Sequence, residues 1–332
     1  MSDGGDGFGE VMSELLHARI QKIKTVDAAH RPCDARWWWE PNTKTAVIES
    51  ANVIGLAKLP PREFHPFELD TFGLGAVIRA AAAKGAKRCV IGIGGSATND
   101  GGFGLACALG WEFLDRYDAP IDHWTELHRL ARISPPRRTR WFAELTVAVD
   151  VQNPLLGVRG ATRVYGPQKG LRPSEFREAE RNLRRLDAVF SQRRSQTAAT
   201  IAGAGAAGGL GFGLMTFLGA KAEPGFDLFA RFAKLNERLR LADLVITGEG
   251  CIDDSTFMGK GVGEIARRCR KEKIPCLGFA GKIAARAAAN RFFTEARALT
   301  GLTAVAKAKT DSARWLTQLT EQTARQWRQA KA

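Results

Sequence analysis

Four glycine-rich clusters carry polar or charged side chains of the kinds that bind phosphate groups. They are Asp3–Gly7 (DGGDG), Gly94–Gly102 (GGSATNDGG), Gly203–Gly211 (GAGAAGGLG) and Gly248–Gly250 (GEG), the last followed by Asp253 and Lys260. Glycine has no Cβ and tolerates positive φ, so the backbone N–H groups of such a cluster can come close to a ligand. Where a helix begins directly afterwards, its free amides and its dipole favour an anion. The clusters therefore indicate an anionic ligand.

The same clusters could also be tight turns and places where helices pack closely. None of them is a P-loop: before Lys260, Asp254 stands where that motif needs a glycine, and Gly261 stands where it needs Ser or Thr. Gly203, Gly205 and Gly208 have the spacing of a dinucleotide fingerprint, but no convincing strand precedes them. The fingerprint is therefore a weak signal in this chain.

Phosphoryl transfer is the chemistry that these groups could perform together. It needs in-line positioning, positive charge on the phosphate oxygens, and a group that accepts the proton of the attacking hydroxyl. Asp100 or Asp150 could accept that proton, and Lys169 or Lys260 could supply the charge. An acidic side chain beside the loops could also hold Mg²⁺. The sequence leaves open which residue has which role, and its metal ligands are unknown.

Short apolar runs that end in glycine or aspartate predict the strands that position these loops. They are Arg88–Gly94, Leu145–Asp150, Ala242–Gly250 and Ile274–Gly281. Such runs are typical of buried strands in a parallel sheet, whose carboxyl ends present ligand loops. A further segment, residues 37–53, begins with three tryptophans and reads as a strand pair in which the tryptophans serve packing.

Helical segments alternate with these strands. Apolar spacing predicts helices over residues 71–84, with Thr71 as N-cap, over residues 174–190, with Ser174 as N-cap, and after Asp311. A further helix is expected over residues 103–109, directly after the second glycine cluster. Alternating strands and helices favour an α/β fold with a mostly parallel sheet.

Length and composition limit the class of protein. The 332 residues suggest two domains, and 45% hydrophobic against 25% charged residues is typical of a globular chain. No long apolar run predicts a membrane span, the start does not resemble a signal peptide, and six scattered cysteines favour free thiols. We expect a cytoplasmic protein. The net charge of +14 is dispersed, which argues against nucleic-acid binding.

Several long motifs resemble those of the type I glycerate kinases, in the order in which that family has them. They are SDGGDG from Ser2, GGSATNDGGFGLACALG from Gly94, DVQNPLLGVRGATRVYGPQKG from Asp150, AGAGAAGGLGFGLMTFLGA from Ala202 and ADLVITGEGCIDDSTFMGK from Ala242. Together they extend over nearly the whole chain. They are therefore far more specific than a single glycine pattern.

The resemblance implies a Rossmann-like parallel-sheet domain built from both chain ends, residues 1–10 and 240–332, with a second α/β domain, residues 11–239, inserted between them. It implies ATP and Mg²⁺, D-glycerate as the phosphoryl acceptor, and the possibility of a homodimer. The residues that it marks fall into three groups. The catalytic candidates are Asp100, Asp150 and Lys260; the substrate-binding candidates are Ser96, Thr98, Asn99, Asn153, Gln168 and Lys169; the cofactor-binding candidates are Asp3, Gly4, Gly5, Asp6, Gly248, Glu249, Gly250 and Asp253.

Three departures from the family pattern accompany this resemblance. The family usually has a strand, a lysine-containing loop and a helix before the DGG loop, so the first strand and helix of the Rossmann-like domain are expected to be missing here. Ser255 stands where glutamine is usual, and Asp6 and Phe8 replace a usual glutamate and threonine. Three functions follow as alternatives: an active glycerate kinase, an inactive relative or truncated chain that keeps a ligand pocket, and a nucleic-acid binder.

Overall fold

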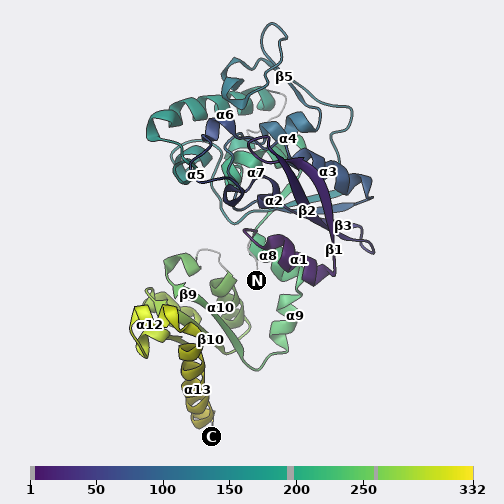
Figure 1. Cartoon of the computed structure of the whole chain (residues 1–332). Helices are drawn as coiled ribbons and strands as arrows, with labels where there is room; N and C mark the ends of the chain where they lie inside the picture. Colours follow the sequence, from purple (N-terminus) through teal and green to yellow (C-terminus); the bar gives the residue numbers. More distant parts are fainter. Residues whose placement is uncertain (1–3, 193–197, 258–260, 332) are drawn as a thin grey trace. The chain divides into compact units, whose positions relative to one another are not determined.

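The computed structural model describes residues 4–192, 198–257 and 261–331, and these form two compact units. The larger unit lies within residues 4–229 and the smaller within residues 230–331, so the boundary falls inside one helix, α8 (Gly225–Phe232). Figure 1 labels the elements of both units. Each unit has its own sheet and is described by itself.

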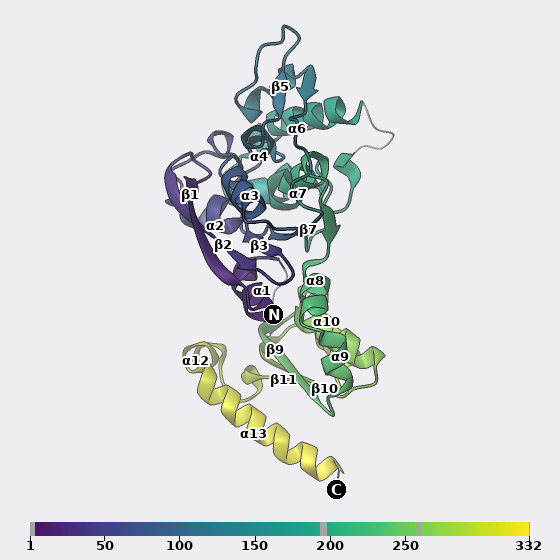
Figure 2. The same cartoon turned by 90° about the vertical axis from the view of Figure 1, so that its right-hand side faces the viewer.

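The larger unit is built on a six-stranded sheet with the order β1-β2-β3-β4-β7-β8. The strands of this unit are β1 (Arg19–Val26), β2 (Pro32–Glu40), β3 (Thr45–Glu49), β4 (Arg88–Gly92), β5 (Glu112–Leu114), β6 (Arg132–Ser134), β7 (Glu144–Ala148) and β8 (Lys221–Glu223). β1, β2 and β3 pair antiparallel, whereas β3, β4, β7 and β8 pair parallel. β1 and β2 form a long twisted ribbon at one side of this unit (Figure 2). β5 and β6 form a separate small hairpin.

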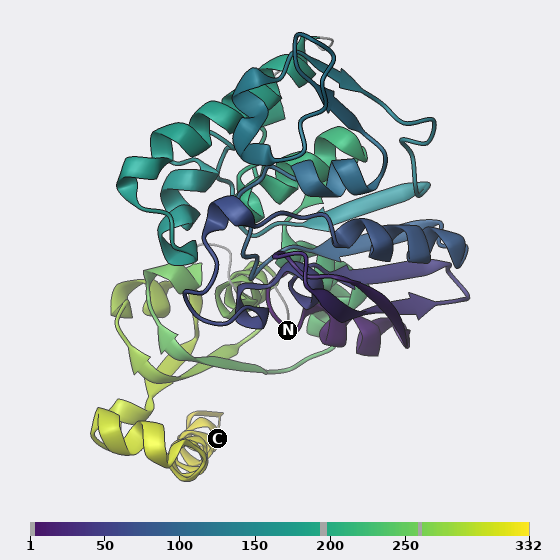
Figure 3. The ribbon, with the colours of Figure 1, turned by 45° about the horizontal axis from the view of Figure 1, so that its top comes forward.

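Helices cover both faces of this sheet. Those of the larger unit are α1 (Phe8–Leu16), α2 (Ala51–Ile54), α3 (Leu74–Ala83), α4 (Phe103–Ala108), α5 (Ala161–Lys169), α6 (Phe176–Ser191), α7 (Ala206–Phe217) and α8. Short 3-10 turns occur at Leu56–Lys58, Pro66–Glu68, Trp124–Arg129, Pro173–Glu175 and Ala198–Thr200. Figure 3 shows α1, the purple helix beside the N-terminus, and α3, the blue helix, on opposite sides of β2 and β3.

Alternation along the strands explains this two-sided packing. Successive side chains of a strand point to opposite faces, so neighbours in sequence enter different cores. Trp37, Ile48 and Ile91 join the main core on the face of α3. Trp38, which is 1% exposed, instead lies against α1, where a Cβ on Gly9 would come within 1.9 Å of its ring. The prediction that the tryptophans serve packing is confirmed for Trp37 and Trp38.

The smaller unit has a parallel three-stranded sheet with the order β11-β10-β9. Its elements are α9 (Leu235–Arg240), β9 (Val245–Ile252), α10 (Gly261–Lys271), β10 (Cys276–Ile283), α11 (Arg286–Phe292), β11 (Glu295–Ala298), α12 (Val305–Thr310) and α13 (Ser312–Lys331), with 3-10 turns at Asp254–Phe257 and Leu299–Gly301. Leu277 and Phe279 of β10 pack with Ala308 of α12 and Leu319 of α13 in its core.

The strands at residues 88–94, 145–150, 242–250 and 274–281 are confirmed as β4, β7, β9 and β10, with ends shifted by a few residues. The strand pair of residues 37–53 is confirmed as β2 and β3. Two helix starts are wrong. α3 begins at Leu74 because the Thr71 hydroxyl binds Asp100 instead of capping it, and α6 begins at Phe176 after a 3-10 turn that contains Ser174.

The division of the chain differs from the one expected from the resemblance. Residues 4–10 pack in the larger unit, where Gly94 N donates to Gly4 O at 3.1 Å. Phe8 is fully buried there, against β4. The segment therefore belongs with residues 11–229 rather than with the C-terminal sheet. Among the described residues, no helix combines the length and the apolar character that crossing a membrane requires.

Candidate active site

A cleft of about 1570 Å³ lies in the larger unit, where the parallel strands β3, β4 and β7 end. Glu49 ends β3, Gly94 to Ser96 follow β4, and Asp150 follows β7, and all of them line the cleft. The carboxyl ends of parallel strands are the usual place for a ligand in an α/β sheet. Two further predicted residues, Gln168 and Lys169, line it from the end of α5.

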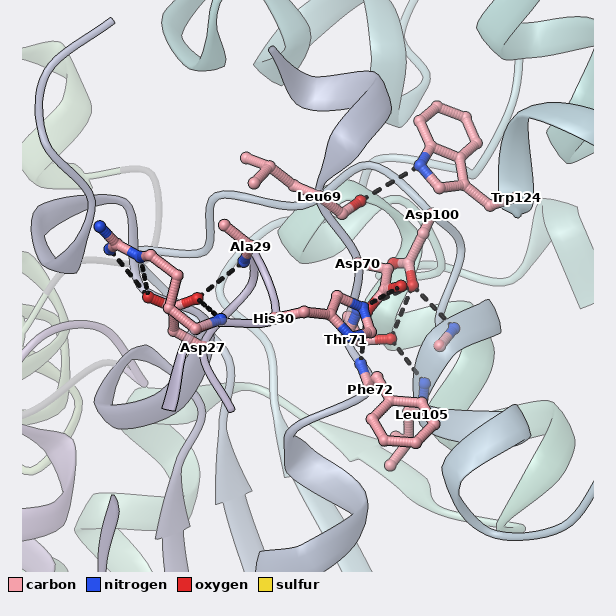
Figure 4. A network of polar contacts seen from close by, with 12 residues as sticks. Asp27, Ala29, His30, Leu69, Asp70, Thr71, Phe72, Asp100, Leu105 and Trp124 are labelled. Carbon is pink, nitrogen blue, oxygen red and sulfur yellow. Dashed lines mark hydrogen bonds and ion pairs between the residues drawn. The ribbon is translucent and has the colours of Figure 1, made fainter. Parts of the chain in front are cut away.

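The loop between β4 and α4 is held in place by Asp100, which is completely buried. Asp100 Oδ2 accepts hydrogen bonds from Thr71 N (3.0 Å), Thr71 Oγ1 (2.7 Å) and Gly104 N (3.0 Å), and Oδ1 accepts one from Gly102 N (3.2 Å). Thr71 Oγ1 in turn accepts from Leu105 N at 2.9 Å (Figure 4). The carboxylate thus satisfies backbone donors at the start of α4, and Asp100 does not line the cleft.

The pKa of Asp100 is raised to about 6, mainly by burial and also by the neighbouring Asp70 carboxylate. The hydrogen bonds from Thr71 and Gly104 act in the opposite direction because they stabilise the charged form. Asp70 itself lies 2.8 Å from His30, whose side chain is 49% exposed (Figure 4). A chain of polar groups therefore runs from the surface to the buried loop.

Lys169 is a buried cation of the cleft wall, and only 6% of it is exposed. Its Nζ donates to Ser96 Oγ at 3.0 Å and to Thr98 O at 2.7 Å. Burial lowers the pKa of Lys169 to about 7, while the Asp100 carboxylate opposes this shift. A lysine with a lowered pKa in a cleft is a candidate binding group with a physical rationale.

Thr98, Asn99 and Asn153 support the loops without lining the cleft. Asn99 Nδ2 donates to Thr162 Oγ1 at 3.1 Å, whereas Asn99 Oδ1 and Thr98 Oγ1 have no hydrogen-bond partner among the described residues. Asn153 Oδ1 accepts from Tyr165 Oη at 2.8 Å, and its Nδ2 donates to Arg159 O at 2.7 Å. Asn153 thereby positions Tyr165, which does line the cleft.

Gly4, Gly5 and Asp6 bring the first glycine cluster to the same cleft. The approach is close, since a Cβ on Gly94 would lie 2.5 Å from Gly5 Cα. Glu49, which the sequence reasoning missed, fixes the start of α1, the helix that follows this glycine cluster. Its carboxylate accepts hydrogen bonds from Gly7 N at 3.2 Å and from Gly9 N at 2.8 Å. An acidic residue at the end of a buried strand was the signal that could have revealed it.

Replacing Glu49 with glutamine should destabilise the larger unit by about 1–2 kcal/mol, because a buried charge-assisted acceptor of two helix amides is lost. Urea unfolding measures the change. Glu14→Gln, on the exposed side of α1, is the matched control and should have little effect. Equal stability of the two variants would contradict the role given to Glu49.

Another part of the cleft wall comes from the segment of residues 55–69, which the sequence reasoning also missed. His65 joins this wall to the start of α6: its Nε2 lies 3.2 Å from Glu175 Oε2, and its Nδ1 accepts from Phe67 N at 3.2 Å. The two contacts together give the tautomer in which Nε2 carries the proton. Arg62 lines the cleft beside it with a φ of 63°.

The third glycine cluster, Gly203–Gly211, serves close packing, which is the second of the two interpretations that the sequence allowed. Gly101 N donates to Gly208 O at 3.1 Å, and Gly102 and Gly213 face each other so closely that a Cβ on either would lie 2.7 Å from the other's Cα. The cluster thus brings α7 against the loop of residues 93–102. Ala206 and Ala207 of the cluster line the cleft.

The fourth cluster lies in the smaller unit, where Gly248, Glu249 and Gly250 line a groove of about 1140 Å³ between β9, β10, α12 and α13. Asp253 does not line it; a carboxylate oxygen of Asp253 accepts from Ser255 N at 2.8 Å. The other walls include Ile246, 61% exposed, and Leu316, 42% exposed. Thr247 Oγ1 is buried there without a partner among the described residues.

The structure therefore brings only part of the predicted site together. Gly4, Gly5, Asp6, Ser96, Asp150, Gln168 and Lys169 share the cleft of the larger unit, and Gly248, Glu249 and Gly250 share the groove of the smaller one. Asp3 and Lys260 lie outside the described residues. Within the described ranges, no three His, Cys, Asp or Glu side chains gather closely enough to hold a metal ion.

Comparison with known proteins gives one consistent family. Residues 1–328 match the model of the glycerate kinase family. The chain is 37% identical to glycerate kinase from Halalkalibacterium halodurans and 35% identical to glycerate 2-kinase from Escherichia coli, over 85% of this chain and 75% of each relative. A crystal structure from Salmonella typhimurium LT2, named for glycerate kinase 2, matches with a TM-score of 0.78 and 33% identity over 90% of this chain and 79% of that chain.

Proposed function

The chain belongs to the glycerate kinase family, and from this premise we propose which of its residues bind the two substrates of an ATP-dependent phosphorylation of glycerate. In that reaction a glycerate hydroxyl oxygen forms a bond to the γ-phosphorus of ATP, and the bond from that phosphorus to the β,γ-bridging oxygen breaks. ADP leaves with the electron pair of the broken bond, and the hydroxyl proton passes to a base. The protein contributes mainly positioning and charge.

The proposed glycerate site rests on the burial of Lys169 and on the contacts of its ammonium group. A buried ammonium in a cleft, whose local partners are the neutral Ser96 hydroxyl and the Thr98 carbonyl, lacks a directly bonded anion among the contacts that the structure gives it. The carboxylate of D-glycerate would supply one, and a charge-assisted hydrogen bond is about twice as strong as a neutral one. We therefore place the glycerate carboxylate at Lys169 and Ser96, with Gln168 beside them.

Asp150 is the better candidate for the base of the two that the sequence leaves open. Asp150 lies at the end of β7 and lines the cleft, where one carboxylate oxygen accepts from Gly225 N at 3.1 Å. Asp100 is enclosed by its four donors and does not line the cleft. A general base must reach the proton that it removes, so geometry favours Asp150.

The groove of the smaller unit supports a proposal for the nucleotide. Its volume suits a drug-sized ligand, and its apolar walls at Ile246 and Leu316 suit the faces of a purine ring. The Gly248–Gly250 loop and Lys282 lie on the same groove and would meet polar groups of the ligand. Within the larger unit, we propose that the Gly4–Asp6 loop lines the part of the cleft that binds the phosphoryl group, because glycines let a ligand approach the backbone closely.

Mg²⁺ would fit the cleft as an ion that is held jointly by a protein carboxylate and by the phosphates of the substrate. Mg²⁺ is usually held by one or two carboxylates together with waters and substrate phosphates, rather than by a cage of side chains. The absence of a three-ligand cluster among the described residues agrees with this mode, and Asp6 is the cleft carboxylate that we propose as a ligand, with Asp150 kept as the base. When bound, the ion would neutralise charge on the phosphate oxygens.

The protein should release ADP from ATP and Mg²⁺ only when D-glycerate is present. A coupled assay of the purified chain measures this directly, and the same assay with D-glycerate omitted is its control. Binding of glycerate or ATP in calorimetry without ADP formation would favour the alternative of an inactive relative that keeps a ligand pocket.

Lys282→Ala should raise the KM for ATP about threefold to tenfold and leave the KM for glycerate unchanged, because a partly solvated cation near a phosphate contributes about 1 kcal/mol. Steady-state kinetics in both substrates gives the two constants. Lys271→Ala, at the exposed end of α10, removes the same charge from the same unit away from the groove. A change of glycerate KM alone would contradict the nucleotide site.

A further inference from the structure

We propose that Asp100 is a positioning residue whose buried carboxylate keeps the ammonium of Lys169 charged, so that the cleft can accept an anionic substrate. The proposal rests on the function proposed above. It assigns Asp100 neither contact with the substrate nor proton transfer, which is the role that the sequence alone allowed for it.

The geometry brings both groups to one short loop, the segment from Ser96 to Gly104, which carries Asp100 and is contacted by Lys169 from the end of α5. Lys169 Nζ bonds to Thr98 O, two residues before Asp100, and Asp100 is fixed by amides two and four residues after itself. Asp100 is completely buried and Lys169 is 6% exposed. Opposite charges in the interior attract strongly because solvent does not screen them.

The end of α5 places Lys169 beside this loop. Pro167 and Gly170 bound the last turn of α5, and Gly170 ends the helix with a φ of 108°. Lys169 therefore stays within reach of Ser96 and Thr98. Without a nearby negative charge, burial alone would favour its neutral form, which cannot attract a carboxylate.

The charged and titratable neighbours of the pair come from every side of the loop. Around Asp100, Asp70 lies beside Thr71 and pairs with His30, and Cys107 follows on α4 (Figure 4). Asp70 opposes the charge of Asp100, and the Thr71 hydroxyl supports it. In the cleft that Lys169 lines, the other titratable and charged groups are Asp6, Glu49, Arg62, Glu63, His65, Glu68, Asp150 and Tyr165. Asp100 is the charged group that offsets the burial of Lys169.

The proposal predicts a shift in the titration of Lys169. Asp100→Asn removes the negative charge and should move the midpoint of the Lys169 titration about one pH unit lower. Asp100→Glu, which keeps the charge, should restore it. Since the ammonium is lost as pH rises through its pKa, the glycerate KM of the asparagine variant should rise at a lower pH than in the wild type. At pH 8 we expect an increase of about tenfold.

The titration is followed by NMR of the full chain with ¹³C-labelled lysine Cε, the Lys169 signal being assigned as the one lost in Lys169→Met. This measurement does not require catalytic activity. An inactive wild-type protein would therefore contradict the proposed function, whereas the role of Asp100 would still be tested by the Lys169 titration. Phe103→Leu, in the core of α4, is the control for lost stability and should not move the midpoint.

A folded Asp100→Asn protein whose Lys169 titrates as in the wild type would overturn the proposal. Should that variant fail to fold, Thr71→Val decides. It removes one donor from Asp100, so the carboxylate is neutral over a wider pH range and the midpoint should again fall, by a smaller amount. An unmoved midpoint in Thr71→Val would then overturn the proposal.

Discussion

Replacing Lys169 with methionine should lower kcat/KM for glycerate about 100-fold, with a much smaller change in the KM for ATP. The loss of a charged hydrogen bond to a substrate carboxylate, about 1.5–3 kcal/mol, accounts for most of this factor. The fold should be retained, because methionine fills the space of the lysine stem and removes a group whose burial is costly. Steady-state kinetics and thermal unfolding measure the two effects separately.

Lys84→Met is the matched control, since Lys84 is an exposed lysine at the end of α3. The control should keep the kinetic constants of the wild type. If Lys169→Met bound glycerate as well as the wild type does, the carboxylate site would lie elsewhere in the cleft, and Arg62 would become the next candidate because it is a second cation on the cleft wall.

Gly208→Ala should destabilise the larger unit by about 3 kcal/mol or more. A Cβ there would lie 1.8 Å from Thr98 O and 2.8 Å from Asn99 Cα, and the residue has a φ of +68°. Backbone atoms cannot move aside cheaply, so the loop that holds Lys169 would have to shift. Urea unfolding followed by tryptophan fluorescence reports mainly on this unit, because six of the eight tryptophans lie in it.

Gly219→Ala separates the backbone strain from the contact. Gly219 has nearly the same conformation, with a φ of +71°, but a Cβ added there would meet nothing within 4 Å. We expect a cost of about 1–2 kcal/mol from left-handed strain alone. If the two variants were equally stable, the close packing of α7 on the loop would not matter to stability.

The sequence predicted the sheet better than the helix starts. After their exposed first residues, β4 and β7 are mostly apolar because both faces of these strands are covered, and this pattern needs no tertiary information. The start of α3 could not be predicted, because Thr71 is a good N-cap by residue type. Its hydroxyl is instead taken by Asp100, which lies 29 residues later in the chain.

The candidate site shows the same limit. Residue type and loop position marked Asp100 and Asp150 equally, and only the tertiary contacts reveal that one is enclosed while the other lines the cleft. Glu49 was missed because its segment carries no glycine cluster, although it ends a strand whose neighbours carry such loops. Residues 55–69 were missed because a cleft wall without regular spacing has no sequence signal.

Hydrogen exchange of the full chain, with each substrate added separately, tests the central claim most directly. We expect D-glycerate to slow amide exchange in residues 94–102 and 161–170, and ATP with Mg²⁺ to slow it in residues 245–252 and 308–316. Glycerate protection confined to the smaller unit, or no protection of the loop that holds Lys169 at saturating glycerate, would contradict the assignment of the acceptor site to the cleft of the larger unit.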